Sequence, residues 1–318
     1  MRIAVLLSTY NGAAYLPAQL DSVLAQQGAD LTVFVRDDGS SDGTQDILRA
    51  YAAADGRVRY VNPDESTNIG VVLSFFSLLR AAHGFDAYGF CDQDDVWQPE
   101  KLAVTARRLS EVRATTPALV YTDLAVVDEN LAVMNPSMIR SQSGQANTQF
   151  VQELTENSVT GSTALFNAAL RERLLSYTGG LAAAARCAVM HDWWAALVAA
   201  AFGELIYMDR PTVLYRQHGQ NVLGARTWKK RLKKLAGGHF FERYWDLIKR
   251  TQLQAIGLLE GYGEALDVEK RDLLAAFAHI SAKPFGERVR DVRTYNLRKN
   301  RAAHTAIFRF LLRTNFLK

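Results

Sequence analysis

The sequence predicts an α/β fold, Rossmann-like, in which a mostly parallel sheet is flanked by helices and is followed by a basic helical region. Strand-like and helical patterns alternate over residues 1–112, and polar residues follow the ends of several strands. After residue 222 the pattern becomes helical throughout. Parallel strands need crossover connections, so the alternation indicates helices on both faces of a sheet. We expect one domain over 1–222 and a C-terminal region over 223–318.

The first strand is predicted over 3–10, where a continuous apolar run ends in small polar residues. Such a run is typical of a strand that is buried on both faces. A helix over 14–28 follows, because its leucines recur at helical spacing and a glycine ends it. Further strands are predicted over 31–36, 58–62 and 85–91, and further helices over 44–56, 68–84 and 101–112.

The second half of the expected domain is less regular. Residues 118–133 have strand character around a turn at 128–130, and the polar segment 140–150 is predicted to be a mobile loop. A strand and a helix are expected over 157–175, a helix over 190–203, and two strands around a proline-marked turn over 205–221. The helices predicted after the boundary span 227–235, 239–263, 267–280 and 298–318.

Composition excludes several classes of protein. The chain has 48% hydrophobic and 22% charged residues, which is ordinary for a globular protein. Its two cysteines, Cys91 and Cys187, belong to no paired motif, so we expect buried free thiols and a reducing compartment. The apolar run Ile3 to Leu7 is too short for a signal peptide, and no segment approaches the ~18 apolar residues of a membrane span.

The net charge of +4 conceals an asymmetry along the chain. Residues 1–222 carry 16 basic and 24 acidic residues, whereas residues 223–318 carry 21 basic and 9 acidic ones. The basic region is either a solvated helical surface or a surface for an anionic membrane, a lipid-linked phosphate or nucleic acid. Its aromatic residues follow helical spacing and are expected in the core, so we predict no specific nucleic-acid recognition.

Three polar clusters follow predicted strand ends, at residues 9–11, 37–40 and 92–95. Ligands of open α/β sheets bind beyond the carboxyl ends of the strands, so we expect these clusters to meet at one crevice. Asp92 and Asp94 suit a hard cation such as Mg²⁺ or Mn²⁺. The alternative is that Asp94 or Asp95 caps the next helix.

The segment "RDDGSSDGT" has glycines and short polar side chains that favour a tight loop. Asp38 could accept a hydrogen bond from the N3–H of a uracil or thymine ring, or it could belong to a capping turn. The chain has neither a Gly-x-Gly-x-x-Gly fingerprint nor a phosphate-binding Walker loop, so nicotinamide and ATP sites lack their main support.

Taken together, several segments resemble family 2 inverting glycosyltransferases of the GT-A fold, in the bacterial rhamnosyltransferase-like branch. They are "STYNGAAYLPAQLDSVLAQ", "VRDDGSSDGT", "NIGVVLSF", "FCDQDDVWQPEKL", "NSVTGSTALFN", "MHDWWAALVAAAFG" and "VLYRQHGQNVLGA". The resemblance covers roughly residues 1–225, and the order and number of the motifs make it specific. The helical tail matches no motif of the family.

The resemblance implies a role for each cluster. Thr9 and Tyr10 would line the nucleotide pocket, and Asp38 would read the pyrimidine. Asp92 and Asp94 match the family's Asp-x-Asp motif, in which the first faces the ribose and the metal and the second holds the metal. Asp95 is expected to cap a helix or to support the other two.

Asp192 matches the family's base position. Inverting transfer needs one base that takes the proton of the acceptor hydroxyl. The alternative is that Asp192 only caps its helix; a helix N-terminus would favour its charged form and burial would oppose it. His191 is expected to orient neighbours or to belong to the core.

The resemblance also implies roles for the segment around residue 218 and for the acceptor side. His218 would complete the metal site, and Arg216 would contact the diphosphate because a guanidinium suits phosphate. Gly161, Ser162 and Trp193 would lie beside the acceptor. The family's Gln-x-x-Arg-Trp motif is missing, which argues against processive synthesis.

These residues predict a metal-dependent inverting glycosyltransferase that uses a dTDP- or UDP-sugar, with rhamnose from dTDP-rhamnose as the expected donor. The acceptor would be a lipid-linked saccharide of cell-surface polysaccharide or lipopolysaccharide. The enzyme would lie in the cytoplasm at the inner face of the membrane, where its basic helices contact anionic lipid or a second copy of the chain. The alternative is a non-catalytic protein that binds a sugar nucleotide on the same fold.

Overall fold

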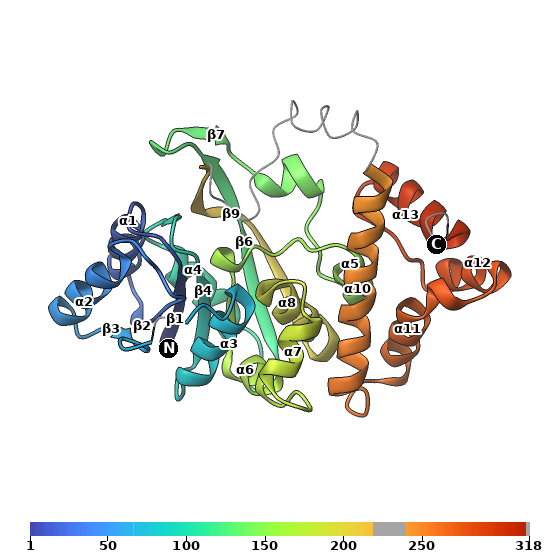
Figure 1. Ribbon diagram of the computed structural model, residues 1–318, viewed down its shortest axis with the longest axis horizontal. Helices are drawn as coiled ribbons and strands as arrows, with labels where there is room; N and C mark the ends of the chain where they lie inside the picture. Colours follow the sequence, from blue (N-terminus) through green and yellow to red (C-terminus); the bar gives the residue numbers. More distant parts are fainter. Residues whose placement is uncertain (66, 219–239, 316–318) are drawn as a thin grey trace.

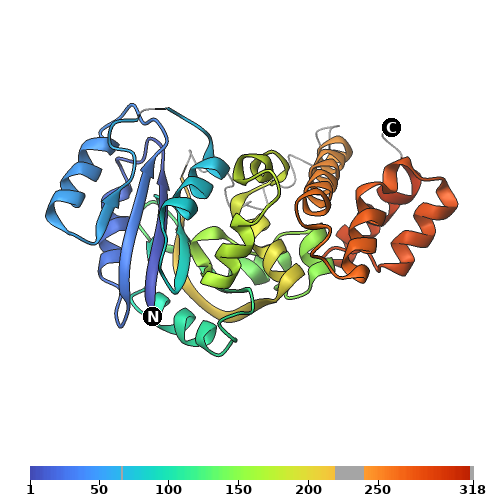
Figure 2. The same ribbon diagram turned by 90° about the horizontal axis from the view of Figure 1, so that it is seen from below.

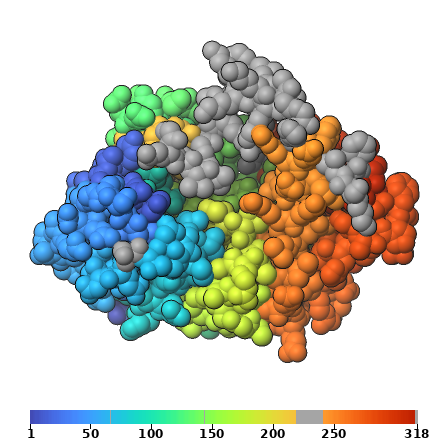
Figure 3. Space-filling model, viewed as in Figure 1, coloured from blue at the N-terminus to red at the C-terminus, as the bar shows by residue number. Residues whose placement is uncertain are grey.

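The computed structural model describes residues 1–65, 67–218 and 240–315 of the chain. The N-terminal part of the sheet and the C-terminal helices lie at opposite ends of the molecule (Figures 1 and 2). Residues of the middle of the chain lie between these ends, and the space-filling view shows the same order from blue to red (Figure 3).

The described strands form one nine-stranded sheet with the order β3-β2-β1-β4-β8-β6-β9-β5, and β7 pairs with β6. Strands β3, β2, β1 and β4 are all parallel, whereas β8 runs antiparallel to both of its neighbours. The strands are β1 (Arg2–Thr9), β2 (Asp30–Asp37), β3 (Val58–Tyr60), β4 (Ala87–Cys91), β5 (Val96–Trp97), β6 (Ala118–Val127), β7 (Val133–Asn135), β8 (Leu165–Asn167) and β9 (Glu204–Arg216).

Helices flank the sheet and continue beyond it. The α-helices of the first 218 residues are α1 (Leu16–Leu24), α2 (Thr44–Ala54), α3 (Val71–Ala81), α4 (Lys101–Ser110), α5 (Phe150–Thr155), α6 (Ala168–Leu175), α7 (Leu181–Cys187) and α8 (His191–Phe202). The C-terminal ones are α10 (Phe240–Tyr262), α11 (Val268–Ala278), α12 (Phe285–Thr294) and α13 (Ala302–Thr314). Three short helices are η1 (Ile139–Ser143, π), η2 (Gly161–Thr163, 3₁₀) and η3 (Ile280–Ala282, 3₁₀).

Strand β1 shows why the apolar N-terminal run forms a central strand. Successive side chains of a strand point to opposite faces. Ile3, Val5 and Leu7 join one buried cluster, which includes residues of α1, α2 and α4. Ala4 and Leu6 join the other cluster, on the face of α3, α6 and α8. A continuous apolar run is therefore required at this place, because both faces of the sheet are covered.

The second cluster extends from the sheet into the C-terminal helices. Helix α8 is buried over its whole circumference, from His191 to Ala201, which is the pattern of a central core helix. The same cluster includes Ile248 of α10, Phe277 of α11 and Phe308 of α13. Several aromatic residues of this region thus contribute to the core, as predicted, whereas Phe241, Phe285 and Phe310 are exposed. The predicted domain boundary at 222–223 and the predicted helix over 227–235 lie outside the described residues.

Strand β9 corrects one prediction. The proline-marked turn expected within 205–221 is absent from the described residues up to 218, because β9 runs through Pro211 as one strand. Met208 of β9 pairs with Thr122 of β6, and the next pair joins Pro211 of β9 to Asp123 of β6, so the register shifts at this point. A proline has no backbone N–H to donate, and a bulge is where a sheet tolerates it.

The segment 140–150 is also more ordered than predicted. It begins within the π-helix η1 and ends at the first residue of α5, so the prediction of a loop holds only for 144–149. Its Asn147 is fully buried, and the Asn147 side chain donates hydrogen bonds to Glu153 Oε2 and to the carbonyl of Glu156. Helices α7 and α12 were not predicted at all.

The two cysteines are free thiols. Cys91 is buried, as predicted, whereas Cys187 is only half-buried. Within the described ranges, no helix has both the length and the apolar composition that a membrane span requires.

Candidate active site

The ends of β2, β1 and β4 are tied together by hydrogen bonds. The backbone N–H of Asp38 donates to the Thr9 carbonyl at 2.8 Å, and the Thr9 hydroxyl donates to Gln93 Oε1 at 2.6 Å. Gln93 Oε1 also accepts from the Tyr10 N–H at 2.8 Å. Gln93 therefore holds the acidic loop against the end of β1. No role was predicted for this glutamine, although its place between Asp92 and Asp94 was a usable signal.

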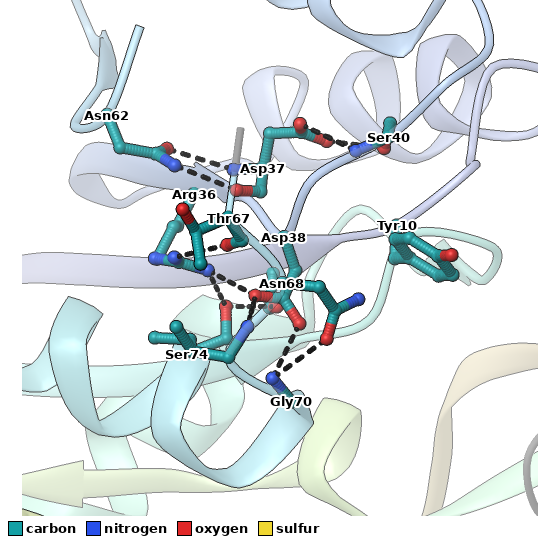
Figure 4. Close-up of polar contacts among 12 residues, drawn as sticks. Tyr10, Arg36, Asp37, Asp38, Ser40, Asn62, Thr67, Asn68, Gly70 and Ser74 are labelled. Atoms are coloured by element: carbon teal, nitrogen blue, oxygen red, sulfur yellow. Dashed lines mark hydrogen bonds and ion pairs between the residues drawn. The ribbon is translucent and has the colours of Figure 1, made fainter. Parts of the chain in front are cut away.

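Tyr10 and Asp38 differ in exposure. The Tyr10 ring is 50% exposed, so it is available to a ligand. Asp38 is buried, and its carboxylate accepts from Arg36, from the Ile69 N–H at 2.8 Å and from the Gly70 N–H at 2.9 Å (Figure 4). Gly70 has a φ of +84°, a backbone conformation that favours glycine. Asp38 thus fixes the loop that begins α3.

Asp94, Arg216 and His218 meet, although they are far apart in the sequence. His218 Nε2 lies 2.8 Å from Asp94 Oδ2, and the Arg216 Nε donates to the Asp94 carbonyl at 3.1 Å. The His218 ring stacks on Tyr15 with a centroid separation of 4.5 Å, and the Arg216 guanidinium lies 5.1 Å from the same ring. The end of β9 is therefore brought onto the acidic loop after β4.

Asp95 supports this arrangement from inside the protein. It is fully buried, and its Oδ1 accepts from the Arg216 N–H at 3.3 Å. Burial raises the pKa of Asp95 well above its ordinary value, and the charges of Asp92 and Asp94 raise it further. Asp95 does not cap the next helix, α4, because the N-cap residue of α4 is Glu100. Its position matches the predicted supporting role.

The surroundings of Asp92 disfavour its ionised form. It is half-buried, and its carboxylate accepts no hydrogen bond within the part of the chain that the structure describes. Burial and the charges of Asp94 and Asp192 raise its pKa. Asp94 and Asp192 thus both act on Asp92, and a cation beside it would stabilise its ionised form.

Asp192 lies at the N-terminus of α8 and accepts two backbone hydrogen bonds. The Gly161 N–H donates to its Oδ2 at 2.9 Å, and the Trp193 N–H donates to its Oδ1 at 2.6 Å. Burial nevertheless raises the pKa of Asp192 to about 6, because the loss of solvation outweighs these two bonds. A carboxylate with such a pKa is ionised at neutral pH and is a stronger base than an exposed aspartate.

Two of the three residues predicted beside the acceptor, Gly161 and Trp193, contact the Asp192 carboxylate through their backbone N–H groups. Gly161 and Ser162 are fully buried, and Trp193 is 5% exposed with its Nε1 donating to the Glu153 carbonyl at 2.7 Å. A Cβ at Gly161 would lie 2.9 Å from His191 Nε2, so a glycine is needed for this close approach. Whether these three residues touch an acceptor stays a prediction.

His191 belongs to the core. Its ring stacks on Phe75 at a centroid distance of 3.7 Å and meets Phe90 edge-on at 4.7 Å. Burial lowers the pKa of His191 to about 3, so the ring is neutral at physiological pH. It can support Gly161 by packing, but it is not placed as a proton carrier.

Glu153 is a buried acid that sequence reasoning missed. It lies on α5, and burial raises its pKa to about 8, to which the charge of Asp192 adds. It is therefore largely protonated at neutral pH. The polar segment around it, "TQFVQELTEN", has no pattern that could have shown it to be near Asp192.

The residues fit a divalent cation only in part. Asp94 and His218 are in contact, and Asp92 lies close enough to Asp94 for their charges to interact. In residues 1–65, 67–218 and 240–315, however, no three His, Cys, Asp or Glu side chains form a group that could hold a metal ion. Two protein ligands leave most positions of an octahedral ion to water and substrate oxygens, as is usual for Mg²⁺.

The raised pKa of Asp192 predicts the acid limb of the pH profile. If Asp192 acts as a base, it must be ionised, so kcat/KM, which follows the pKa of the free enzyme, should fall to about half at pH 6 and to about a tenth at pH 5. Initial rates between pH 5 and 8 test this, with circular dichroism as the control for folding. A rate that stays constant down to pH 5 in folded protein would contradict the role of Asp192.

A family model and a curated relative both identify glycosyltransferases as proteins similar to this chain in sequence. Residues 4–175 match the family model "Glycosyl transferase family 2". The chain is 27% identical to "dTDP-rhamnosyl transferase RfbG" of Shigella flexneri over 238 residues, which are 72% of this chain and 78% of that protein.

Solved structures resemble the fold at low sequence identity. S. aureus TarS 1-349, solved in complex with UDP, has a TM-score of 0.57 at 16% identity and matches 99% of this chain and 91% of its own. The mannosyltransferase PcManGT of Pyrobaculum calidifontis, solved with GDP-Man and Mn²⁺, has a TM-score of 0.52 at 19% identity, with 92% and 84% covered. These likenesses concern the fold alone.

Proposed function

The chain belongs to glycosyl transferase family 2, and from this premise we propose that it transfers a sugar from a pyrimidine nucleotide to a saccharide hydroxyl with inversion at the anomeric carbon. The observation that carries the proposal is that Asp94, in the loop after β4, and Asp192, on α8, both lie near enough to Asp92 to raise its pKa. Such a group of carboxylates can hold both a cation and a base.

Asp192 is the proposed base. It removes the proton of the acceptor hydroxyl, and the hydroxyl oxygen bonds to the anomeric carbon from the face opposite the nucleotide. The bond from this carbon to the diphosphate oxygen breaks, and the nucleoside diphosphate leaves with that electron pair. The two N–H donors of Gly161 and Trp193 keep the carboxylate in one orientation. Gly161, Ser162 and Trp193 form the acceptor side of the proposed site.

The nucleotide would lie along the ends of β1, β2 and β4. Thr9, Tyr10 and Asp38 would face the nucleobase. Asp92 would face the ribose. Arg216 places a positive charge beside the proposed position of the diphosphate. Mg²⁺ or Mn²⁺ would be held by Asp94 and His218 with Asp92 beside them, and it would offset the charge that develops on the leaving diphosphate.

A transfer assay tests the function. We propose rhamnose as the sugar because RfbG, a dTDP-rhamnosyl transferase, shares 27% identity with the chain. The purified protein is incubated with radiolabelled dTDP-rhamnose and lipid-linked oligosaccharide, with and without Mn²⁺, and label in the lipid fraction is counted. Label transfer is expected. Tight donor binding without transfer or hydrolysis would instead support the sugar-nucleotide-binding protein that is the alternative.

We also propose that the C-terminal helices dock the enzyme to the anionic inner face of the cytoplasmic membrane. Arg298 and Arg313 lie near enough to Arg309 for their positive charges to lower its pKa, in addition to the effect of burial. No carboxylate within the described residues forms an ion pair with any of the three. Phe285, at the start of α12, is 60% exposed. Positive charge and an exposed ring together suit an anionic lipid surface.

Liposome co-sedimentation tests the docking. The double variant Arg298→Gln, Arg313→Gln should bind vesicles of anionic lipid about thirtyfold more weakly, since each basic residue contributes ~1 kcal/mol. Neutral vesicles are the lipid control, and Arg49→Gln on exposed α2 is the matched protein control. Binding that is unchanged by the double variant, or by high salt, would contradict the proposal. A second copy of the chain as the partner would appear instead as a dimer in sedimentation velocity.

A further inference from the structure

Arg36 is an unusual residue for the place it occupies. It is the next-to-last residue of β2 and is 4% exposed, in a strand whose buried positions before it, Leu31, Val33, Phe34 and Val35, are apolar. A buried arginine needs acceptors for its guanidinium, and this one has three. Its NH1 contacts Asp38 Oδ1 at 2.5 Å and Ser74 Oγ at 3.3 Å, and its NH2 donates to the Thr67 carbonyl at 3.2 Å (Figure 4).

We propose that Arg36 is a specificity-determining positioning residue that restricts the nucleotide to uracil or thymine and excludes guanine. It does so by occupying one oxygen of Asp38, the residue proposed to read the base. This inference rests on the proposed function, because it assumes that a nucleoside diphosphate binds along the ends of β1 and β2. It adds which residue makes the proposed pyrimidine site selective against guanine.

The argument depends on how many donors Asp38 can still accept. A carboxylate has about four lone-pair positions, two on each oxygen. On Oδ1, both are used by Arg36 NH1 and the Ile69 N–H. On Oδ2, one is used by the Gly70 N–H. A single position therefore remains, and it is on Oδ2.

The nucleobases differ in the donors that they offer to one carboxylate. Uracil and thymine present a single N3–H between two carbonyls, which matches the one position left on Asp38. Guanine presents N1–H and the neighbouring N2 amino group, which pair with a carboxylate through both of its oxygens. With Oδ1 occupied, one guanine donor would be buried without an acceptor, which weakens binding by about five- to a hundredfold.

Arg36 cannot easily move away to admit guanine. Ser74 is fully buried on α3, and its hydroxyl lies 2.6 Å from the Ser8 hydroxyl as well as in contact with Arg36. The guanidinium is thus held between β1, α3 and the loop before α3. Displacing it would break its ion pair with Asp38 and its hydrogen bond to the Thr67 carbonyl.

Nucleotide titration of two Arg36 variants tests the inference. Dissociation constants for UDP, dTDP and GDP are measured calorimetrically with Mg²⁺ present. The unmodified protein should bind UDP and dTDP at least about fivefold more tightly than GDP. Arg36→Met frees Oδ1 and should reduce this preference at least about fivefold, chiefly through tighter GDP binding. Arg36→Lys keeps a donor for Oδ1 and should retain the preference.

Controls separate this inference from the function on which it rests. Arg59→Met removes an exposed arginine of the neighbouring strand β3 and should change nothing. If Arg36→Met does not fold, as judged by its melting curve, UDP methylated at N3 is titrated against the unmodified protein and should bind at least about fivefold more weakly than UDP.

The outcomes are distinct. A preference for GDP, an unchanged UDP-to-GDP ratio in folded Arg36→Met, or equal binding of N3-methylated UDP overturns the role of Arg36 while nucleotide binding stands. If the unmodified protein binds none of the three nucleotides, the proposed function itself fails, and the inference fails with it.

Discussion

Replacing Asp192 with asparagine is expected to abolish sugar transfer and to leave donor binding nearly unchanged. A general base contributes about 10²–10⁴-fold to the rate, and asparagine cannot accept the proton. Asparagine keeps the shape of the side chain, and its carbonyl can still accept from the Gly161 N–H. We therefore expect a fall in kcat of about 10²–10⁴-fold, measured with labelled donor at saturating acceptor.

Two controls make the result specific. Asp46→Asn removes an exposed carboxylate of α2 whose surface ion pair contributes little, so its rate should match that of the unmodified protein. Calorimetric binding of the nucleoside diphosphate to Asp192→Asn should agree within about threefold, since the base does not touch the nucleotide in the proposed arrangement. If Asp192→Asn keeps more than about a tenth of the rate, the base is another residue or Asp192 is only a structural cap.

The second large effect is expected for Asp94→Ala. This change removes the carboxylate that contacts His218 and that is proposed to hold the cation. Loss of groups around a metal site lowers metal affinity by about 10–100-fold, and we expect at least this loss for a direct ligand. Binding of UDP or dTDP should therefore lose its dependence on Mn²⁺ or Mg²⁺, and transfer should fall in parallel.

Isothermal titration with and without EDTA measures this effect. The matched control is Asp64→Ala, an exposed aspartate with no contact to the site. His218→Ala should show the same loss of metal dependence in a milder form, because Asp94 remains. Metal-stimulated nucleotide binding that survives both substitutions would show that the cation, if one binds, is held elsewhere.

Much of the fold followed from local pattern. The apolar run of β1 and the helical spacing of apolar residues in α1, α3 and α8 are visible in the sequence. Each of these elements lies within about the range that was predicted for it. The clusters after β1, β2 and β4 were expected together because parallel neighbours end at the same edge of a sheet. The hydrogen bonds that join Thr9, Asp38 and Gln93 confirm this expectation.

Other features depended on contacts between distant residues. Arg36 looked like a polar residue at a strand end, and its pairing with Asp38 and Ser74 is visible only once β2 packs against α3. Glu153 lay in an ordinary polar segment, yet folding brings it near Asp192. A turn was predicted at Pro211 because proline favours turns locally. The pairing of β9 with β6 instead keeps the strand continuous through this residue.

By itself, the sequence determined the strand and helix order, the burial of β1 on both faces and the family motifs, because periodicity and turn chemistry act between near neighbours along the chain. The tertiary structure alone decided which carboxylates share one electrostatic environment, which oxygens of Asp38 are occupied and why His191 is neutral. Burial and the approach of charges depend on residues more than a hundred positions apart, such as His218 and Asp94, and no pattern of near neighbours along the chain shows which distant residues will meet.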